Sequence, residues 1–440
     1  MTAELKRTMG LGALVIYGVG DMLGAGIYGL IGKAAGLMGH LMWAGFCGAM
    51  LAALFTGLSY ATIGSRYPRA AGAAYVTARA YGKPWLTWLV GLGVAASGLT
   101  SMATGSRVIA GYLQKLGIDL PTPVLAITAL VLIASIVWRG MRESTWFNVV
   151  CTGVEVSGLL LVIAVGIPYW GNVDLTTPPL GAEDGGTIAR ILIQGAVLTF
   201  FSFIGFEDML NVSEEAKEPE RNVPLALCLA LVIATVIYLA VCVTALSVLT
   251  PAELGASKAA LVDVVGRAAP WFPPSAFTAI GIFAVANTAL LNFVMGSRLL
   301  YGMSRQGLLP LALGRIHPTR HTPHVAIMTL LGIVGVLMLT ADIDALASAT
   351  SLLLLTAFVV VNMALVVLKL RPQEPRGRFE VPLVVPILGA VICAALIAAR
   401  VLDPAADRRA PLITAGILAV LAVLYAIVRP KGEAVEEAVG

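Results

Sequence analysis

The chain consists of long apolar runs separated by short polar segments. Repeated apolar runs of about 18 or more residues are typical of helices that cross a lipid bilayer. We therefore predict an all-α membrane protein of about twelve transmembrane helices, an even number that places both termini on the same side. The predicted spans are residues 11–37, 41–63, 84–113, 123–138, 147–169, 190–212, 224–249, 273–300, 323–341, 344–368, 382–401 and 410–428.

The loops between these spans differ in positive charge. Of the 29 Lys and Arg residues, 20 fall in or next to one set of loops and 8 in the other, and Arg107 lies inside the third span. The positive-inside rule makes the basic set cytoplasmic. We expect a multi-pass inner-membrane protein with a cytoplasmic N-terminus at residues 1–10 and a cytoplasmic tail at 429–440. The basic amphipathic segment 66–83 is expected to lie on the cytoplasmic surface as a short helix.

The first span contains a carboxylate beside two glycines. Asp21 lies in the middle of the apolar run, and Gly24 and Gly26 follow it. Glycine weakens a helix, and a charge in hydrocarbon is costly. Together they favour a local break that lines a wet cavity. Close packing of small residues against neighbouring helices is the alternative interpretation of the glycines.

The sixth span has a similar centre, in which Phe201, Ser202, Gly205 and Glu207 combine aromatic, hydroxyl, glycine and acidic residues. It lies about 180 residues after the first break. Two interrupted helices in corresponding positions indicate a binding site between two inverted repeats. We predict a 5+5 inverted repeat of residues 11–169 and 190–368, followed by two peripheral helices at 382–428.

Unwound backbone provides a physical basis for binding a zwitterion. Free N–H groups at the start of a half-helix attract a carboxylate, whereas free carbonyls attract an ammonium group or a small cation. We assign Gly24, Ala25 and Gly26 to the carboxylate of an amino acid, and Phe201, Ser202 and Ile204 to the amine side and the side-chain pocket. The full set of predicted substrate-binding residues is Asp21, Met22, Gly24, Ala25, Gly26, Phe201, Ser202, Phe203 and Ile204.

Three acidic residues lie inside predicted spans: Asp21, Glu155 and Glu207. We expect each to face the cavity, since a charged carboxylate is costly against lipid. We hypothesise that Glu155 or Glu207 exchanges a proton and that Asp21 holds a substrate amine or a cation. The structural alternative is a carboxylate that caps loose backbone N–H groups or pairs with Arg107.

Four segments resemble the amino acid–polyamine–organocation superfamily. They read GDMLGAGI (20–27), FSFIGFE (201–207), EEAKEPERNVP (214–224) and RLLYGMSRQGLLP (298–310), and they occur in the family's order along most of the chain. The resemblance implies a leucine-transporter-type fold with ten core helices, two peripheral helices and alternating access.

The chain departs from this family at two charged positions. Several proton-coupled members carry a lysine on the fifth helix, where this chain has Glu155, and Asp21 stands where the family usually has a neutral residue. The lysine mechanism therefore does not transfer to this chain.

The predicted function is secondary active amino acid transport, with proton coupling as the first hypothesis. Transport or exchange of cationic amino acids or polyamines is the alternative that the extra acids suggest, and a non-transporting amino acid sensor is the alternative of another class. Sodium coupling stays open because Asn287, Thr288 and Asn292 on the eighth span offer oxygens.

We expect no enzyme, cofactor or metal site. The sequence has no GxxxxGK[ST], HExxH or GxSxG motif, and the five cysteines lie in apolar segments without CxxC spacing. With 58% hydrophobic and 12% charged residues, the net charge of +4 does not indicate a nucleic-acid partner. The expected partners are a small-molecule substrate and the lipid bilayer.

Overall fold

The computed structural model describes residues 9–68, 72–139, 141–179, 182, 184–305, 309–318, 320, 322–340, 342–404 and 407–428. Residues 1–8 of the predicted N-terminus and the predicted tail at 429–440 lie outside this part of the chain. Its described elements are helices, with one isolated β-bridge between Met9 and Ala216.

The elements fall into three sets. The helices before the loop that joins η2 to α8 are α1 (Leu11–Met22), α2 (Ala25–Met38), α3 (Met42–Arg66), α4 (Gly72–Tyr81), α5 (Pro84–Lys115), α6 (Thr122–Arg139) and α7 (Met141–Gly166). Those after it are α8 (Gly185–Phe200), α9 (Pro219–Val248), α10 (Pro251–Ala256), α11 (Ala260–Ala268), α12 (Pro274–Arg305), α13 (His324–Thr340), α14 (Ile343–Leu370), α15 (Val384–Leu402) and α16 (Arg409–Val428). The 3₁₀ turns are η1 (Gly39–Leu41), η2 (Ile167–Tyr169), η3 (Phe201–Phe203), η4 (Phe206–Glu215) and η5 (Leu311–Gly314).

Ten stretches of the described residues are long and apolar enough to cross a membrane. The first stretch, Leu11–Arg66, contains α1, α2 and α3, and the helix His324–Leu339 is apolar but shorter. The predicted helical membrane fold is confirmed at this level. The predicted spans match the observed helices closely at most ends, but α7 begins six residues, and α8 and α9 each five residues, before the predicted start.

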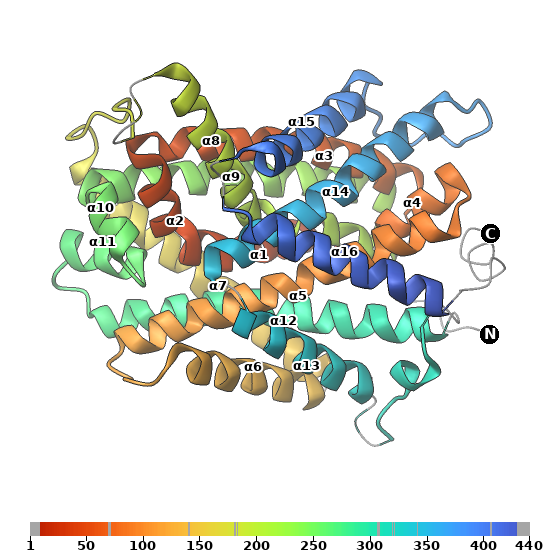
Figure 1. Ribbon diagram of the computed structural model, residues 1–440, viewed down its shortest axis with the longest axis horizontal. Coiled ribbons are helices and arrows are strands. Elements are labelled where there is room, and N and C mark those ends of the chain that lie inside the picture. Colours follow the sequence, from red (N-terminus) through yellow and green to blue (C-terminus); the bar gives the residue numbers. More distant parts are fainter. Residues whose placement is uncertain are drawn as a thin grey trace.

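The long helices enclose the interrupted ones. Helix α5 packs against α12 and α14, while α3 packs against α8 and α9, and α1 also packs against α9. Figure 1 shows α10 and α11 at one end of the molecule, and α4 with the C-terminal end of α16 at the other. The two short helices at the first end were not predicted, because each is too short to show a clear period.

The segment 66–83 forms the predicted short helix, α4, but it is packed more deeply than a surface helix. Tyr75, Val76 and Ala80 are buried, and α4 contacts α5 and α14. Its apolar face is therefore covered by protein at the end of the bundle.

The loop between α14 and α15 is tied to neighbouring helices by its acidic residues. Glu380 accepts hydrogen bonds from Arg66 at 2.5 Å and 2.9 Å and from Lys369 at 2.5 Å. Glu374 accepts from Arg79 and from Tyr67, each at 2.7 Å. These bonds join the loop to α3, α4 and α14.

The pKa values of the two acids reflect these partners. Partial burial alone would raise the pKa of Glu380, but its bonds to Arg66 and Lys369 outweigh that effect and lower the pKa from 4.5 to about 2. The pKa of Glu374 is lowered in the same way, with burial opposed by Arg79 and Tyr67. Both carboxylates are therefore ionised at neutral pH and hold the loop against the neighbouring helices through their ion pairs.

Candidate functional site

The first span is interrupted at Leu23 and Gly24. Helix α1 ends at Met22, Leu23 is extended, and α2 begins at Ala25. The N–H of Ala25 donates to the hydroxyl of Thr288 on α12 at 3.2 Å. The break predicted from the glycines and the acid is therefore present, and it leaves the start of α2 facing α12.

The sixth span is interrupted in the same manner. Helix α8 ends at Phe200, a 3₁₀ turn follows, Ile204 is extended, and Gly205 has a φ of 122°. A side chain rarely adopts that φ, so glycine suits the position. The chain then continues as the 3₁₀ segment η4, which is longer than 3₁₀ runs usually are and marks an irregular, hinge-like element.

The two breaks lie against each other in opposite directions. A Cβ on Gly26 would be 2.4 Å from the Cα of Ser202, and a Cβ on Gly205 would be 2.9 Å from the carbonyl carbon of Asp21. The earlier end of one break thus meets the later end of the other. Only glycine allows this backbone approach at Gly26 and Gly205, whereas Gly24 packs against Thr288 on α12, as the alternative interpretation of the glycines expected.

Tyr238 on α9 joins the two breaks. Its hydroxyl lies 2.6 Å from the carbonyl oxygen of Met22 and 2.5 Å from that of Ser202, so its single proton is shared between them. Met22 is the last residue of α1, and Ser202 lies in the 3₁₀ turn η3 that follows α8. The bond holds the breaks in register in a fully buried position.

A narrow cavity of about 10 Å³ lies between the breaks, which is the space of about one water molecule. Its lining residues are Asp21, Met22, Ala25, Gly26, Ser101, Phe201, Ile204, Gly205, Asp208, Thr288 and Asn292. The cavity has no room for an amino acid, so the structure represents a closed site that must widen before such a ligand enters.

The predicted substrate-binding residues divide into two groups. Most of them line the cavity, but Gly24, Ser202 and Phe203 do not. Gly24 lies against the Thr288 hydroxyl, and Ser202 lies against Gly26. Phe203 packs its ring edge-on against Tyr238, with the centroids 5.2 Å apart. These three shape the walls behind the cavity.

The three acidic residues have different surroundings. Asp21 lines the cavity, and its Oδ2 is buried with no hydrogen-bond donor among the described residues. Glu155 is fully buried on α7 outside the cavity, where the amide of Asn287 lies 3.4 Å from its Oε2 and its Oε1 has no described partner. Glu207 accepts from the N–H of Gly205 at 2.9 Å. Only Asp21 therefore faces the cavity as predicted, and Glu207 has the capping contact of the structural alternative.

The proposed pairing of these acids with Arg107 is wrong. Arg107 donates to the carbonyl of Met338 at 2.6 Å and lies 3.5 Å from Asp342. Arg107 lies on α5 nearer its end at Lys115, so its long side chain reaches the loop before α14. Among the described residues, the membrane acids have no cationic partner within 4.0 Å.

Sequence reasoning missed two polar residues of the cavity. Asp208 lies near the end of the predicted sixth span, but it lies in the 3₁₀ segment η4 and lines the cavity. Ser101 lies on an unbroken helix whose sequence has many small hydroxyl residues, so no local signal distinguishes it. Of the three polar residues noted on the eighth span, Thr288 and Asn292 line the cavity, while Asn287 contacts Glu155 and Thr152.

Many membrane spans and a closed polar site between broken helices define a multi-pass membrane transporter. The sequence agrees with this class, because residues 10–430 match the family described as "Amino acid permease". The chain belongs to the amino acid permease family, and its members are transporters rather than enzymes.

Several characterised relatives cover most of the chain. It is 30% identical to the methylthioribose transporter of Bacillus subtilis over 419 residues, which are 89% of this chain and 87% of that protein. It is 29% identical to the branched-chain amino acid permease of the same organism over 421 residues, 90% of this chain and 88% of that protein. It is 28% identical to cationic amino acid transporter 4 of Mus musculus over 402 residues, 85% of this chain and 62% of that protein.

Proposed function

We propose that the protein is a secondary active transporter that moves amino acids across the cytoplasmic membrane by alternating access. The observation that carries this proposal is the contact between the two breaks, where Gly26 meets Ser202 and Gly205 meets Asp21. Non-helical backbone at membrane depth is tolerated where protein or a wet cavity surrounds it. A site that is closed and lined by such backbone suits a carrier better than an open channel.

The arrangement of spans is proposed to be twelve helices in a 5+5 inverted repeat with two peripheral helices. The stretch Leu11–Arg66 supplies two crossings, and the shorter His324–Leu339 supplies one more beside the other nine stretches. The opposite directions of the two breaks support the inverted relation. The excess of Lys and Arg in one set of loops supports a cytoplasmic position for α4 and both termini, with α10 and α11 outside.

The substrate is proposed to bind with its two charges on opposite sides of the cavity. The N-terminal turn of α2 provides N–H groups for the carboxylate at Gly24, Ala25 and Gly26, and the Ala25 N–H leaves the Thr288 hydroxyl when the substrate binds. The unpartnered oxygen of Asp21 is available to the ammonium group. Phe201 and Ile204 line the cavity on the η3 side and are positioned to contact the substrate side chain.

Coupling is proposed to use a proton carried by Glu155. An ionised carboxylate without a cationic partner is costly in a buried site, so the neutral form is favoured there. Tyr28 connects this residue to the break, because Tyr28 lies on α2 and donates to the carbonyl of Glu155 at 2.6 Å. This bond goes to the backbone carbonyl of Glu155, so it ties α2 to the turn of α7 that carries the carboxylate. Glu207 fits this role less well because its carboxylate caps Gly205.

A cationic amino acid or polyamine is the second candidate substrate. Two carboxylates, Asp21 and Asp208, line the cavity, and no lining residue is basic. Among the relatives, one is named for branched-chain and another for cationic amino acids, so the family includes both kinds of substrate.

Counterflow in proteoliposomes tests the proposed function. Purified protein is reconstituted with an unlabelled amino acid or polyamine inside, and uptake of the radiolabelled compound is followed at two pH values, with and without sodium. A transporter accumulates label transiently for its own substrates. Binding without exchange for every compound in the panel would instead identify a sensor and refute transport.

A further inference from the structure

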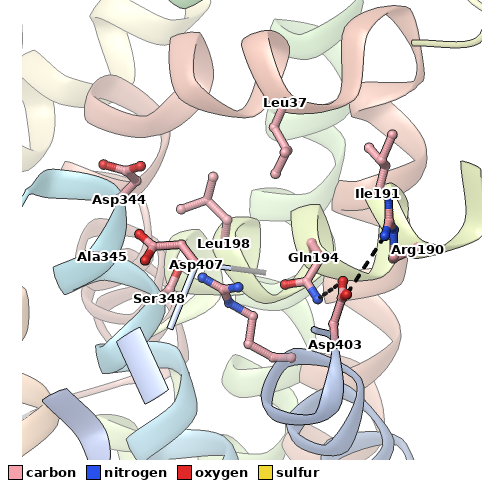
Figure 2. A pocket seen from close by; sticks show the side chains of 11 residues that line it. Leu37, Arg190, Ile191, Gln194, Leu198, Asp344, Ala345, Ser348, Asp403 and Asp407 are labelled. Carbon is pink, nitrogen blue, oxygen red and sulfur yellow. Dashed lines mark hydrogen bonds and ion pairs between the residues drawn. The ribbon is translucent and has the colours of Figure 1, made fainter. Parts of the chain in front are cut away.

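A second and larger pocket lies between α8, the start of α14 and the end of α15, toward the proposed outer face. We call it the outer pocket, and its volume is about 300 Å³. Figure 2 shows Asp344 and Asp407 on one side of it, with Gln194, Asp403 and Arg190 on the other. A space of this size means that side chains do not fill the gap between these helices at this end.

One arginine joins the two helices on the far side of the pocket from α8. Arg400 lies in the last turn of α15. It interacts electrostatically with three acids that line the pocket, Asp407, Asp403 and Asp344. Asp344 lies in the first turn of α14, against which α15 packs. Arg400 therefore helps to hold the end of α15 on the start of α14.

Asp403, just after α15, joins that helix to α8. One oxygen of its carboxylate accepts a hydrogen bond from Gln194 Nε2 at 3.1 Å, and the other lies 3.9 Å from Arg190, as the dashed lines in Figure 2 show. The Asp403 side chain is only 8% exposed. Gln194 Nε2 also donates to the carbonyl of Ala399 at 3.1 Å. These contacts join the middle of α8 to the end of α15.

The outer pocket adjoins the candidate site along α8. Leu198 lines the pocket and Phe201 lines the narrow cavity, and three residues of helix correspond to about 4.5 Å. Helix α8 ends at Phe200, directly before the second break, so it can tilt without bending a continuous helix. A tilt of α8 away from α15 would carry Leu198 outward and extend the pocket toward the cavity.

Burial makes the contacts of Asp403 stronger than those of exposed ion pairs nearby. Asp342, just before α14, lies 2.9 Å from Arg409, but both side chains are more than half exposed. Exposed pairs contribute little because water and salt screen them. A buried carboxylate that accepts a hydrogen bond is screened less, and removing one member of such a group has a larger effect. The position of α8 therefore depends more on Asp403 than on the exposed pairs.

We propose that Asp403 is a latch by which α15 holds α8 in the closed position, and that its release lets the candidate site open into the outer pocket. Because Arg400 holds α15 on α14, α8 is the element that moves. The peripheral helix α15 thus takes part in the transport cycle. The proposal rests on the proposed alternating access, since it assigns the opening toward the outer face to a movement of α8.

Labelling of a cysteine on α8 measures this opening without requiring transport. Leu198 lines the pocket but is only 4% exposed, so L198C should react slowly with a water-soluble maleimide in lipid nanodiscs, where both faces are accessible. Asp403→Asn removes the charge at constant size, and Gln194→Leu removes the donor. Each variant is expected to speed L198C labelling at least about tenfold, the effect of one lost hydrogen bond to a charged group.

Matched controls separate release of the latch from other effects. Asp342→Asn removes the acid of the exposed pair with Arg409 and should speed L198C labelling less than about fivefold. V334C reports general loosening, because Val334 on α13 is fully buried and lines neither pocket. Its labelling should stay slow when it is combined with Asp403→Asn. The unsubstituted protein reports labelling of the five native cysteines.

Three outcomes would overturn the latch. The first is L198C labelling that stays unchanged in Asp403→Asn or in Gln194→Leu. The second is an equal acceleration at V334C, since that would mean a loosened fold rather than a movement of α8. The third is an effect of Asp342→Asn as large as that of Asp403→Asn. Faster L198C labelling without counterflow of any compound would support the latch and refute transport, whereas counterflow with unchanged labelling would refute the latch alone.

Discussion

Acidic residues inside the membrane and acidic residues of the loop between α14 and α15 differ in whether a basic side chain pairs with them. Glu374 and Glu380 in the loop are each held by basic side chains at hydrogen-bond distance. Asp21 and Glu155 in the membrane are more deeply buried, yet no described cation lies within 4.0 Å of either. Paired carboxylates stay ionised and fasten elements together, whereas buried unpaired ones are stable only if they gain a proton or a positively charged ligand.

This difference separates residues that hold the structure from residues that are free to change state. Glu374 and Glu380 already form ion pairs with Arg66, Arg79 and Lys369. The buried carboxylates of Asp21 and Glu155 have no such partner among the described residues, so a substrate amine or a proton can neutralise them. Glu207 lies between these cases, because a backbone N–H satisfies it without a cation.

The largest effect is expected from a single methyl group at the contact between the breaks. Gly26→Ala would place a Cβ 2.4 Å from the Cα of Ser202, and overpacking of this kind costs about 1–3 kcal/mol. Uptake in proteoliposomes should fall about ten- to hundredfold. Gly12→Ala on α1 is the control, because nothing lies within 4 Å of its added Cβ. Equal activity of the two variants would show that the breaks need not touch.

The next effect separates the unpaired acid from the capping acid. Glu155→Gln keeps an oxygen near Asn287 but cannot release a proton, so proton-driven uptake should fall at least about tenfold while counterflow is preserved. Glu207→Gln keeps an acceptor for the Gly205 N–H and should leave proton coupling in place. Uptake by Glu155→Gln that still follows the proton gradient would remove its coupling role.

A smaller effect is expected at the tyrosine that joins the breaks. Tyr238→Phe leaves two buried carbonyls without their shared donor, which should cost about 1–3 kcal/mol of stability and lower uptake several-fold. Tyr112→Phe is the matched control, since it removes a buried hydroxyl that donates to the Tyr28 carbonyl at 2.8 Å. Thermal unfolding should change in both variants, but uptake should change more in Tyr238→Phe. The opposite order would make Tyr238 a packing residue only.

Much of this arrangement follows from the sequence, and its limits have physical causes. The glycines beside Asp21 and at Gly205 predict where the helices break, because apolar periodicity and backbone cost are local properties. The pairing of Arg107 with Asp342 is not local and depends on how α5 approaches α14. The same holds for Asp208, whose direction is set by the 3₁₀ backbone of η4 rather than by its place in the span.

The smallest effect concerns the loop acids and depends on pH. The folded-state pKa of Glu380 is about 2, below its ordinary 4.5, so its stabilising contribution is complete above pH 4.5 and is lost as the pH falls toward 2. Because the group is partly exposed, Glu380→Gln should cost less than about 1 kcal/mol at neutral pH. The difference in melting temperature between this variant and the unsubstituted protein should disappear as the pH falls from 4.5 to about 2.

The control for this prediction is Glu220→Gln. The Glu220 carboxylate is about half exposed and lies 3.4 Å from Arg378, so its removal should change the melting temperature less than that of Glu380. A difference between Glu380→Gln and the unsubstituted protein that persists unchanged to pH 2 would show that the loop is not held by its charge.

A cryo-electron microscopy structure with the best counterflow substrate bound tests most directly whether the breaks grip the ligand. We predict density between residues 22–26 and 201–205, with the ligand carboxylate about 3 Å from backbone N–H groups of Gly24 to Gly26 and its amine beside Asp21. A bound ligand that touches neither break, with residues 21–26 and 201–206 wound into continuous α-helix, would contradict the account.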